Sequence, residues 1–158
     1  MSDSELAKQI IAENLYMVLA TASSDGEPWV SPIFFAYDDQ YNFYWVSNKD
    51  ARHSKLLQEN PRVAISIFDS RAPEGDGDGV YIKADVKELA EIADIRRGMS
   101  IFNNRASKDD FKIKDQSDVT GDGVWRIYQA TPTEVSKLGY GTYVNGQYVD
   151  QRVTVVLV

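Results

Sequence analysis

The sequence predicts a mainly β protein, built as a small closed or split antiparallel β-barrel with a few helices. The first observation is that short runs of β-branched and aromatic residues alternate with turn residues, which is typical of an antiparallel meander. The second is that these runs number roughly seven, with three helical stretches between them, as in a small barrel. The third is that 158 residues, 43% of them hydrophobic, are enough for one core, so we expect a single domain over 1–158.

The elements are predicted one by one from spacing and punctuation. Residues 3–14 have the spacing of an amphipathic helix, with Asp3 or Ser4 as its cap. Further helices are predicted at 51–60 and near 91–104. The strands are predicted at 15–23, 29–37, 42–47, 62–69, 79–89, 124–131 and 133–138.

Three details of this pattern lead to specific expectations. Apolar side chains occupy both alternating faces of 29–37 and 42–47, which predicts that these strands are buried on both sides. Asn145-Gly146 predicts the turn of a C-terminal hairpin. The polar segment 105–121 has no regular pattern, and we expect it to be the most mobile part of the chain.

Charge and composition exclude several kinds of protein. The formal net charge of −7 and a sequence pI near 4.7 leave no basic surface that displaces counterions from nucleic-acid phosphates. There are no cysteines, which excludes disulfides, thiolate metal sites and cysteine nucleophiles. No apolar run has the length of a membrane span, and the N-terminus lacks the pattern of a signal peptide. We therefore expect a cytoplasmic protein that binds neither nucleic acid nor membrane.

A basic stretch interrupts this acidic chain at the start of the second predicted helix. It contains Lys49, Arg52, His53 and Lys55, and Asp50 is the predicted N-cap. Exposed cations at this end of a helix oppose the helix dipole, at a cost of about 0.3–1 kcal/mol each. A bound anion reverses the balance, because free backbone N–H groups and cationic side chains then favour the same phosphate. The stretch alone leaves two interpretations open, a phosphate site and a solvated helix face.

Two further motifs bear on possible chemistry. His53 is the only histidine and therefore the only candidate histidine base, but the sequence names no partner carboxylate for it. Residues 74–85 resemble a calcium loop, yet a Glu begins it, an Asp ends it and a strand follows. A glycine-rich hairpin loop explains that segment better, and no metal site is predicted.

Several motifs follow one another within residues 15–69: "VLATAS", "DGEPWVSPIFF", "WVSN", "ARHSKLL" and "NPRVAISIF". Their order and spacing resemble the pyridoxamine 5′-phosphate oxidase-like family of FMN-binding split barrels. Further along, "GVYIKADVKEL" and "WRIYQATPTEV" look like the later strands of that family. The resemblance covers most of the chain and is strongest over 15–69.

The resemblance implies a homodimer that holds two FMN molecules, each in a groove between subunits. It places the FMN phosphate at the basic helix start and the end of the preceding strand, and the isoalloxazine ring along the strand from Trp29 to Pro32. The implied cofactor-binding residues are Trp29, Val30, Ser31, Pro32, Ser47, Asn48, Arg52, His53 and Lys55.

Pro32 lies inside a predicted strand, where it removes a ladder hydrogen bond and indicates either an edge or a bulge. A bulge would free the backbone at Val30 and Ser31 for the polar edge of a flavin. An ordinary edge proline is the alternative. Trp29, near the start of the strand, is the aromatic side chain expected to line the ring pocket.

Departures from true pyridoxamine-phosphate oxidases predict a different substrate. Ser31 and Ala36 stand where those enzymes carry an arginine and a lysine, and Arg52-His53 replaces their Arg-Lys pair. Their C-terminal Arg-x-His signature has no counterpart, because no histidine follows His53. The sequence therefore predicts a flavoprotein of the general branch of this family, with a substrate other than the vitamin.

The predicted function is that of an FMN-binding oxidoreductase acting on an unidentified small molecule, with a nicotinamide nucleotide as a candidate electron donor. No catalytic residue is assigned, because the cofactor carries the redox chemistry. The alternatives are a deazaflavin-dependent reductase and a non-enzymatic flavin- or haem-binding protein that senses or stores its ligand.

Overall fold

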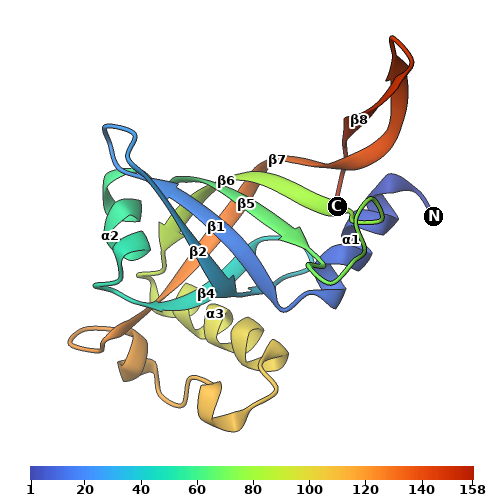
Figure 1. Ribbon diagram of the computed structural model, residues 1–158. Helices are drawn as coiled ribbons and strands as arrows, with labels where there is room; N and C mark the ends of the chain where they lie inside the picture. The colour runs from blue at the N-terminus through green and yellow to red at the C-terminus, as the bar shows by residue number, and fades with distance from the viewer.

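The structure, a computed structural model, describes residues 1–158 and contains an antiparallel sheet of eight strands (Figure 1). The strands follow the order β2-β1-β5-β6-β7-β4-β3 across the sheet, and β8 pairs with β7. They are β1 (Tyr16–Ala22), β2 (Pro28–Phe34), β3 (Ala36–Tyr37), β4 (Phe43–Asn48), β5 (Arg62–Phe68), β6 (Gly79–Glu88), β7 (Trp125–Val144) and β8 (Gln147–Thr154). The helices are α1 (Asp3–Glu13), α2 (Arg52–Glu59) and α3 (Ile92–Arg105), and the 3₁₀ helices are η1 (Asp109–Phe111) and η2 (Gln116–Val119).

The sheet coils into a barrel that is open along one side, which confirms the predicted split barrel (Figure 1). β2 and β3 are the two ends of the strand order, and Phe35 alone separates them in the chain. Residues 45–48 of β4 pair with β7 on one side and with no strand on the other. We call the gap between this part of β4 and the free edge of β2 the seam.

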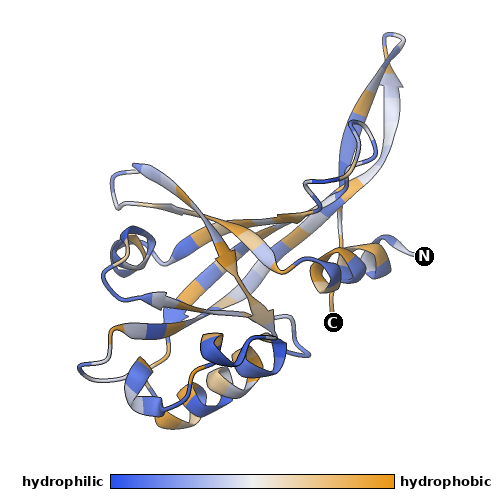
Figure 2. Ribbon diagram, turned by 60° about the horizontal axis from the view of Figure 1, so that its bottom comes forward, coloured by the Kyte–Doolittle hydropathy of each residue, from blue (hydrophilic) through white to orange (hydrophobic).

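Large side chains fill the barrel. Trp45, Phe43 and Phe35 are completely buried, and Trp45 stacks on Tyr128 with ring centroids 5.6 Å apart. The opposite face of β4 packs against α3 through Tyr44, in a second apolar cluster. Figure 2 shows hydrophobic residues concentrated along the crossing strands. The prediction that 42–47 is buried on both sides is therefore confirmed.

The corresponding prediction for 29–37 is wrong. This segment is two strands, β2 and β3, that bend at Phe35. The outer face of β2 is open, with the Val30 side chain 57% exposed and Pro32 exposed beside it. The reason is that β2 is an edge strand, and other parts of this chain, α3 and η1, cover its outer face only at Phe34.

The C-terminal strands also differ from the prediction. The strands expected at 124–131 and 133–138 are one strand, β7, which runs through Pro132. A register shift between Lys83 and Ala84 of the neighbouring β6 takes up the proline. Such a bulge tolerates a residue without an N–H, so Pro132 does not end the strand.

The predicted hairpin at Asn145-Gly146 is confirmed, with φ angles of 51° and 78° at its two turn residues. Beyond the barrel, β7 and β8 continue as a projecting two-stranded arm (Figure 1). The segment predicted at 105–121 contains the two 3₁₀ helices, and its mobility stays a prediction. No helix of this protein is long and apolar enough to cross a membrane.

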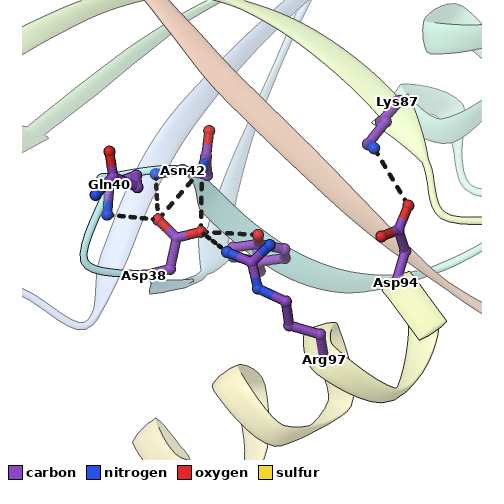
Figure 3. A network of polar contacts seen from close by, with 7 residues as sticks. Asp38, Gln40, Asn42, Lys87, Asp94 and Arg97 are labelled. Carbon is purple, nitrogen blue, oxygen red and sulfur yellow. Dashed lines mark hydrogen bonds and ion pairs between the residues drawn. The ribbon is translucent and has the colours of Figure 1, made fainter.

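The Asp38 cluster, drawn in Figure 3, fastens α3 to the sheet. The Asp38 carboxylate accepts hydrogen bonds from the Gln40 N–H, the Asn42 N–H and amide, the Tyr44 hydroxyl at 2.9 Å and the Arg97 guanidinium at 2.8 Å. Burial alone would raise the pKa of the Asp38 carboxyl, but the bonds from Asn42 and Tyr44 outweigh it and lower that pKa. Burial and the bond to Asp38 raise the pKa of Tyr44 to about 12.

Candidate functional site

The connection from β4 to α2 brings the basic stretch to one end of the barrel. α2 begins at Arg52, and its N-cap is Ala51, which has no side-chain acceptor. The prediction of Asp50 as the cap is wrong by one residue. The Asp50 N–H donates to the Asn48 side chain at 2.8 Å, and the Asp50 carboxylate lies 3.8 Å from the Lys55 ammonium. The helix therefore starts without a side-chain cap, because alanine has no acceptor and Asp50 lies one residue too early.

Backbone donors at the start of α2 are consequently left without partners. The first helical hydrogen bond runs from the Lys55 N–H to the Ala51 carbonyl at 3.0 Å, and the N–H groups of Arg52, His53 and Ser54 make none. Such free donors carry the positive end of the helix dipole. Together with the Arg52 side chain, they form a place that favours an anion.

Arg52 is held above an aromatic ring. Its guanidinium carbon lies 4.1 Å from the centre of the Trp29 ring, so α2 touches the start of β2 through a cation–π contact. Arg52 forms no ion pair with a carboxylate of this chain, and Trp29 is 40% exposed. The pair therefore presents a flat apolar face beside an uncompensated cation.

His53 lies directly behind Arg52 and turns into the barrel. Its Nε2 is 2.8 Å from the Ser47 hydroxyl on β4, and its Nδ1 is 3.3 Å from the Ser31 hydroxyl on β2. Both serines are nearly fully buried, at 6% and 8% exposure. Burial lowers the pKa of His53, which favours the neutral imidazole. No carboxylate contacts the ring, so a charge-paired histidine base is not present here.

Sequence reasoning missed Ser54 and the partners of His53. The Ser54 hydroxyl is completely buried and donates to the Asn48 carbonyl at 2.8 Å, which ties the first turn of α2 to the end of β4. A signal was available, because serine side chains near a helix start often bond to nearby backbone groups. The pairing of His53 with Ser31 carried no local signal, since they are 22 positions apart.

The expected bulge at Pro32 is absent, and the edge alternative is correct. β2 pairs with β1 in an unbroken register in which Pro32 faces Val18 and Ser31 faces Leu19. A proline without an N–H belongs to a pair that exchanges no hydrogen bonds, so the neighbouring Ser31 belongs to a pair that does. The backbone groups that point to the open edge are therefore those of Val30 and Pro32, and those of Ser31 are engaged.

The predicted residues thus gather in three ways. Most of the predicted residues meet where α2 covers the end of the seam. They are Trp29, Ser31, Ser47, Asn48, Arg52 and His53. Val30 and Pro32 lie on the same strand but turn their side chains to the outer face. Lys55 is exposed on α2 and faces Asp50. The two strands and the helix therefore bring most of the predicted set together.

A separate cavity of about 400 Å³ lies on the other face of β4, between α3 and the 3₁₀ segment. Its apolar lining residues are Val46, Phe102, Phe111, Ile113, Val119 and Trp125. Trp125 pairs with Asn48 in the β4–β7 ladder, so one end of the cavity borders the β4–α2 connection. None of the predicted site residues lines it.

The glycine-rich segment 74–85 has a structural role in this protein. The Asp78 carboxylate lies 2.7 Å from the buried ammonium of Lys137, and Asp3 of α1 lies 3.6 Å from the same ammonium. β6 begins at Gly79, as expected for a hairpin loop followed by a strand. Asp78 therefore serves as the counter-ion of a lysine.

Comparison with known sequences identifies related proteins. A family model described as pyridoxamine 5′-phosphate oxidase matches residues 4–138. The pyridoxine/pyridoxamine 5′-phosphate oxidase of Crocosphaera subtropica is 36% identical over 55 residues, which are 35% of this chain and 26% of that protein. The alignment thus spans about a quarter of the length of the curated relatives that match.

Solved structures share the fold at low sequence identity. The haem storage protein HutZ from Vibrio cholerae matches with a TM-score of 0.69 and 18% identity, over 85% of this chain and 94% of that one. A FAD-binding protein from Mesorhizobium loti matches with a TM-score of 0.63 and 20% identity, over 87% of this chain and 94% of that one. At these identities the likeness establishes the fold alone, and it agrees with the split barrel described above.

Proposed function

This chain belongs to the pyridoxamine 5′-phosphate oxidase family, and we propose that it is an FMN-binding flavoprotein that oxidises or reduces a small molecule. The observation that carries the proposal is the start of α2. There, free backbone N–H groups and the Arg52 guanidinium have no anionic partner in this chain. A phosphate monoester supplies the missing acceptors, because its oxygens accept both N–H and guanidinium hydrogen bonds.

The residues beside the helix start fit the ring of a flavin. Trp29 offers an aromatic face, and the open edge of β2 offers the Val30 N–H together with the carbonyls of Val30 and Pro32. A flavin ring has hydrogen-bond donors and acceptors along one edge and two apolar faces. The open backbone groups of β2 match that polar edge, and the Trp29 ring matches an apolar face. When bound, FMN supplies the redox chemistry, and these side chains and backbone groups bind and orient it.

The haem alternative has support from the likeness to HutZ, but the site favours a flavin. Haem in proteins needs an axial ligand, most often a histidine. His53 is the only histidine, and both of its ring nitrogens are hydrogen-bonded to serines. Ligation by His53 would break hydrogen bonds of two buried hydroxyls. A deazaflavin coenzyme also carries a ring and phosphate, so the binding experiment below includes it.

We also propose a homodimer, supported by the outer face of β1 and β2. Its cross-strand neighbours are Tyr16 with Phe34, Val18 with Pro32 and Ala20 with Val30. This continuous apolar surface, with Tyr16 and Val30 exposed, is typical of a protein–protein interface. Sedimentation is expected to give twice the 17.8 kDa mass of the chain. A monomer that binds FMN tightly would contradict a cofactor groove shared between subunits.

The cytoplasm is the compartment proposed for this dimer, as the absence of cysteines suggests.

The binding experiment titrates the purified protein, freed of ligand, with FMN, riboflavin, FAD, a deazaflavin coenzyme and haem. We expect FMN to bind more tightly than riboflavin, because riboflavin lacks the phosphate that the helix start accepts. Bleaching of the bound flavin by a nicotinamide nucleotide would then identify the electron donor. Equal affinities for FMN and riboflavin would falsify the phosphate site, and tight haem binding without flavin binding would replace the proposal by the storage alternative.

A further inference from the structure

The seam of the barrel is bridged by one imidazole. β2 and residues 45–48 of β4 share no backbone ladder, so no backbone hydrogen bond joins these two edges directly. His53 contacts the Ser47 hydroxyl on one edge and the Ser31 hydroxyl on the other. Because an imidazole is rigid and both serines are on strands, the bridge is the direct side-chain link between the two edges.

The bridge is satisfied as it stands. A neutral imidazole has one donor and one acceptor, and each serine hydroxyl can serve as either. The imidazole and both serine hydroxyls therefore have hydrogen-bond partners. A buried polar group without a partner would lower the stability of the fold by about 1–3 kcal/mol. Both ring nitrogens are occupied, which leaves His53 no free ring nitrogen for a ligand phosphate.

Each end of the bridge lies beside a different part of the proposed site. Ser31 stands between Val30 and Pro32, whose backbone groups point to the open edge of β2. His53 follows Arg52 directly at the start of α2, where the free N–H groups are. A movement of the imidazole relative to β2 therefore changes the spacing between the helix start and the open edge.

We propose that His53 is a positioning residue that sets the distance between the phosphate contacts at the start of α2 and the ring contacts on β2. The site then selects a ligand whose planar ring and phosphate are joined by a linker of matching length. This inference rests on the proposed function. It assigns the phosphate to Arg52 and the backbone N–H groups, and it gives His53 a role in spacing instead of direct contact.

The test compares FMN and riboflavin affinities, measured by flavin fluorescence, for wild type, His53→Leu, His53→Gln and Ser31→Ala. Gln58→Leu, at an exposed position of α2, is the matched control. For His53→Leu we expect FMN to bind roughly 10-fold more weakly and riboflavin less than about threefold more weakly, because spacing matters only to a ligand that makes both contacts. His53→Gln keeps an amide donor and acceptor for the serines, so we expect it to restore most of the FMN affinity.

Each outcome separates the two proposals. Wild-type FMN affinity in His53→Leu, with a large loss in Arg52→Ala, overturns the positioning role and leaves the phosphate site standing. If His53→Leu loses FMN affinity and riboflavin affinity by the same factor, the histidine has a purely structural role, and the positioning proposal is again overturned. Failure of the wild type to bind FMN overturns both proposals. If His53→Leu does not fold, Ser31→Ala removes one hydroxyl of the same bridge, and unchanged ratios of FMN to riboflavin affinity in that variant contradict the proposal.

Discussion

The Asp38 cluster and the start of α2 are both polar groups at the rim of the same barrel, yet they are built in opposite ways. At Asp38, donors from the turn, the sheet and α3 converge on one carboxylate, and every one of them is used. At the start of α2, the Arg52 guanidinium and several backbone N–H groups face no acceptor from the chain. The first region is complete by itself, and the second has donors that the chain itself does not match.

This difference separates, in physical terms, a stabilising cluster from the proposed binding site. A folded chain can lower its own free energy by matching donors with acceptors, as at Asp38. Leaving donors unmatched at a helix start opposes folding slightly and benefits the protein only when an anion arrives. The number of hydrogen bonds is therefore a poor guide to function, and the imbalance between donors and acceptors is a better one.

Removal of the acceptor in the complete cluster is expected to have the largest effect on stability. Asp38→Ala leaves the Tyr44 hydroxyl and the Arg97 guanidinium without their partner. We expect a loss of about 3 kcal/mol in the free energy of unfolding, measured by urea denaturation. Asp39→Ala, at the exposed neighbouring position, is the control and is expected to change little. Equal stability of the two variants would show that the cluster is dispensable.

Removal of the cation from the incomplete region is expected to affect ligand binding and not folding. Arg52→Ala removes charge-assisted bonds worth about 1.5–3 kcal/mol to a phosphate, so we expect FMN to bind on the order of 10- to 100-fold more weakly. The melting temperature of the ligand-free protein is expected to stay close to that of the wild type, since only the contact with Trp29 is lost. Lys49→Ala is the control, and equal loss of affinity in both variants would indicate a diffuse basic surface.

Acidification is expected to weaken the fold through His53. Burial holds the pKa of His53 below its usual value of 6.5, so the unfolded chain binds this proton more readily than the folded protein. Its contribution to stability is therefore constant above about pH 7.5 and decreases as the pH falls below 6.5. Melting temperatures at pH 7.5 and pH 5.5 measure the change, and His53→Gln is expected to reduce it. A pH dependence identical in both proteins would place the titrating group elsewhere.

The smallest effect is expected at Lys55. Its ammonium and the Asp50 carboxylate are both well exposed and 3.8 Å apart, and exposed pairs of this kind contribute about 0–1 kcal/mol. We expect Lys55→Ala to leave the unfolding free energy almost unchanged and to weaken FMN binding about two- to threefold at low salt, because its charge attracts the phosphate from a distance. The difference from wild type should disappear in high salt. A loss as large as that of Arg52→Ala would mean direct contact.

The sequence predicts the strands and helices well because their signals are local. Alternation in the strands and the turn at Asn145-Gly146 depend on neighbours in the chain, and both are confirmed. The errors arise where another interaction overrides the local rule that made the prediction. Pro132 sits at a bulge and does not end β7, and Asn48 forms the turn that displaces Asp50 from the cap. The bulge at Pro132 cannot be predicted without the register of β6, whereas the turn at Asn48 rests on a competing local hydrogen bond between residues two positions apart.

For the candidate site, the sequence predicts which residues lie together better than it predicts their contacts. Charge and position at a helix start are enough to single out Arg52 and His53. The inward turn of His53 depends on the barrel closing so that Ser31 and Ser47 lie on opposite sides of one ring. Likewise, the open backbone groups belong to Val30 and Pro32 instead of Ser31, because the pairing with β1 decides which residues face the edge.

The position of the imidazole in the seam also makes this protein convenient for nuclear magnetic resonance. His53 is the only histidine, so labelling this one amino acid with ¹⁵N yields a single pair of ring-nitrogen signals that needs no further assignment. Their chemical shifts distinguish the protonated nitrogen from the bare one, and thus show which serine accepts and which donates. Any event that opens or closes the barrel must change that spectrum, which turns one side chain into a reporter of the whole seam.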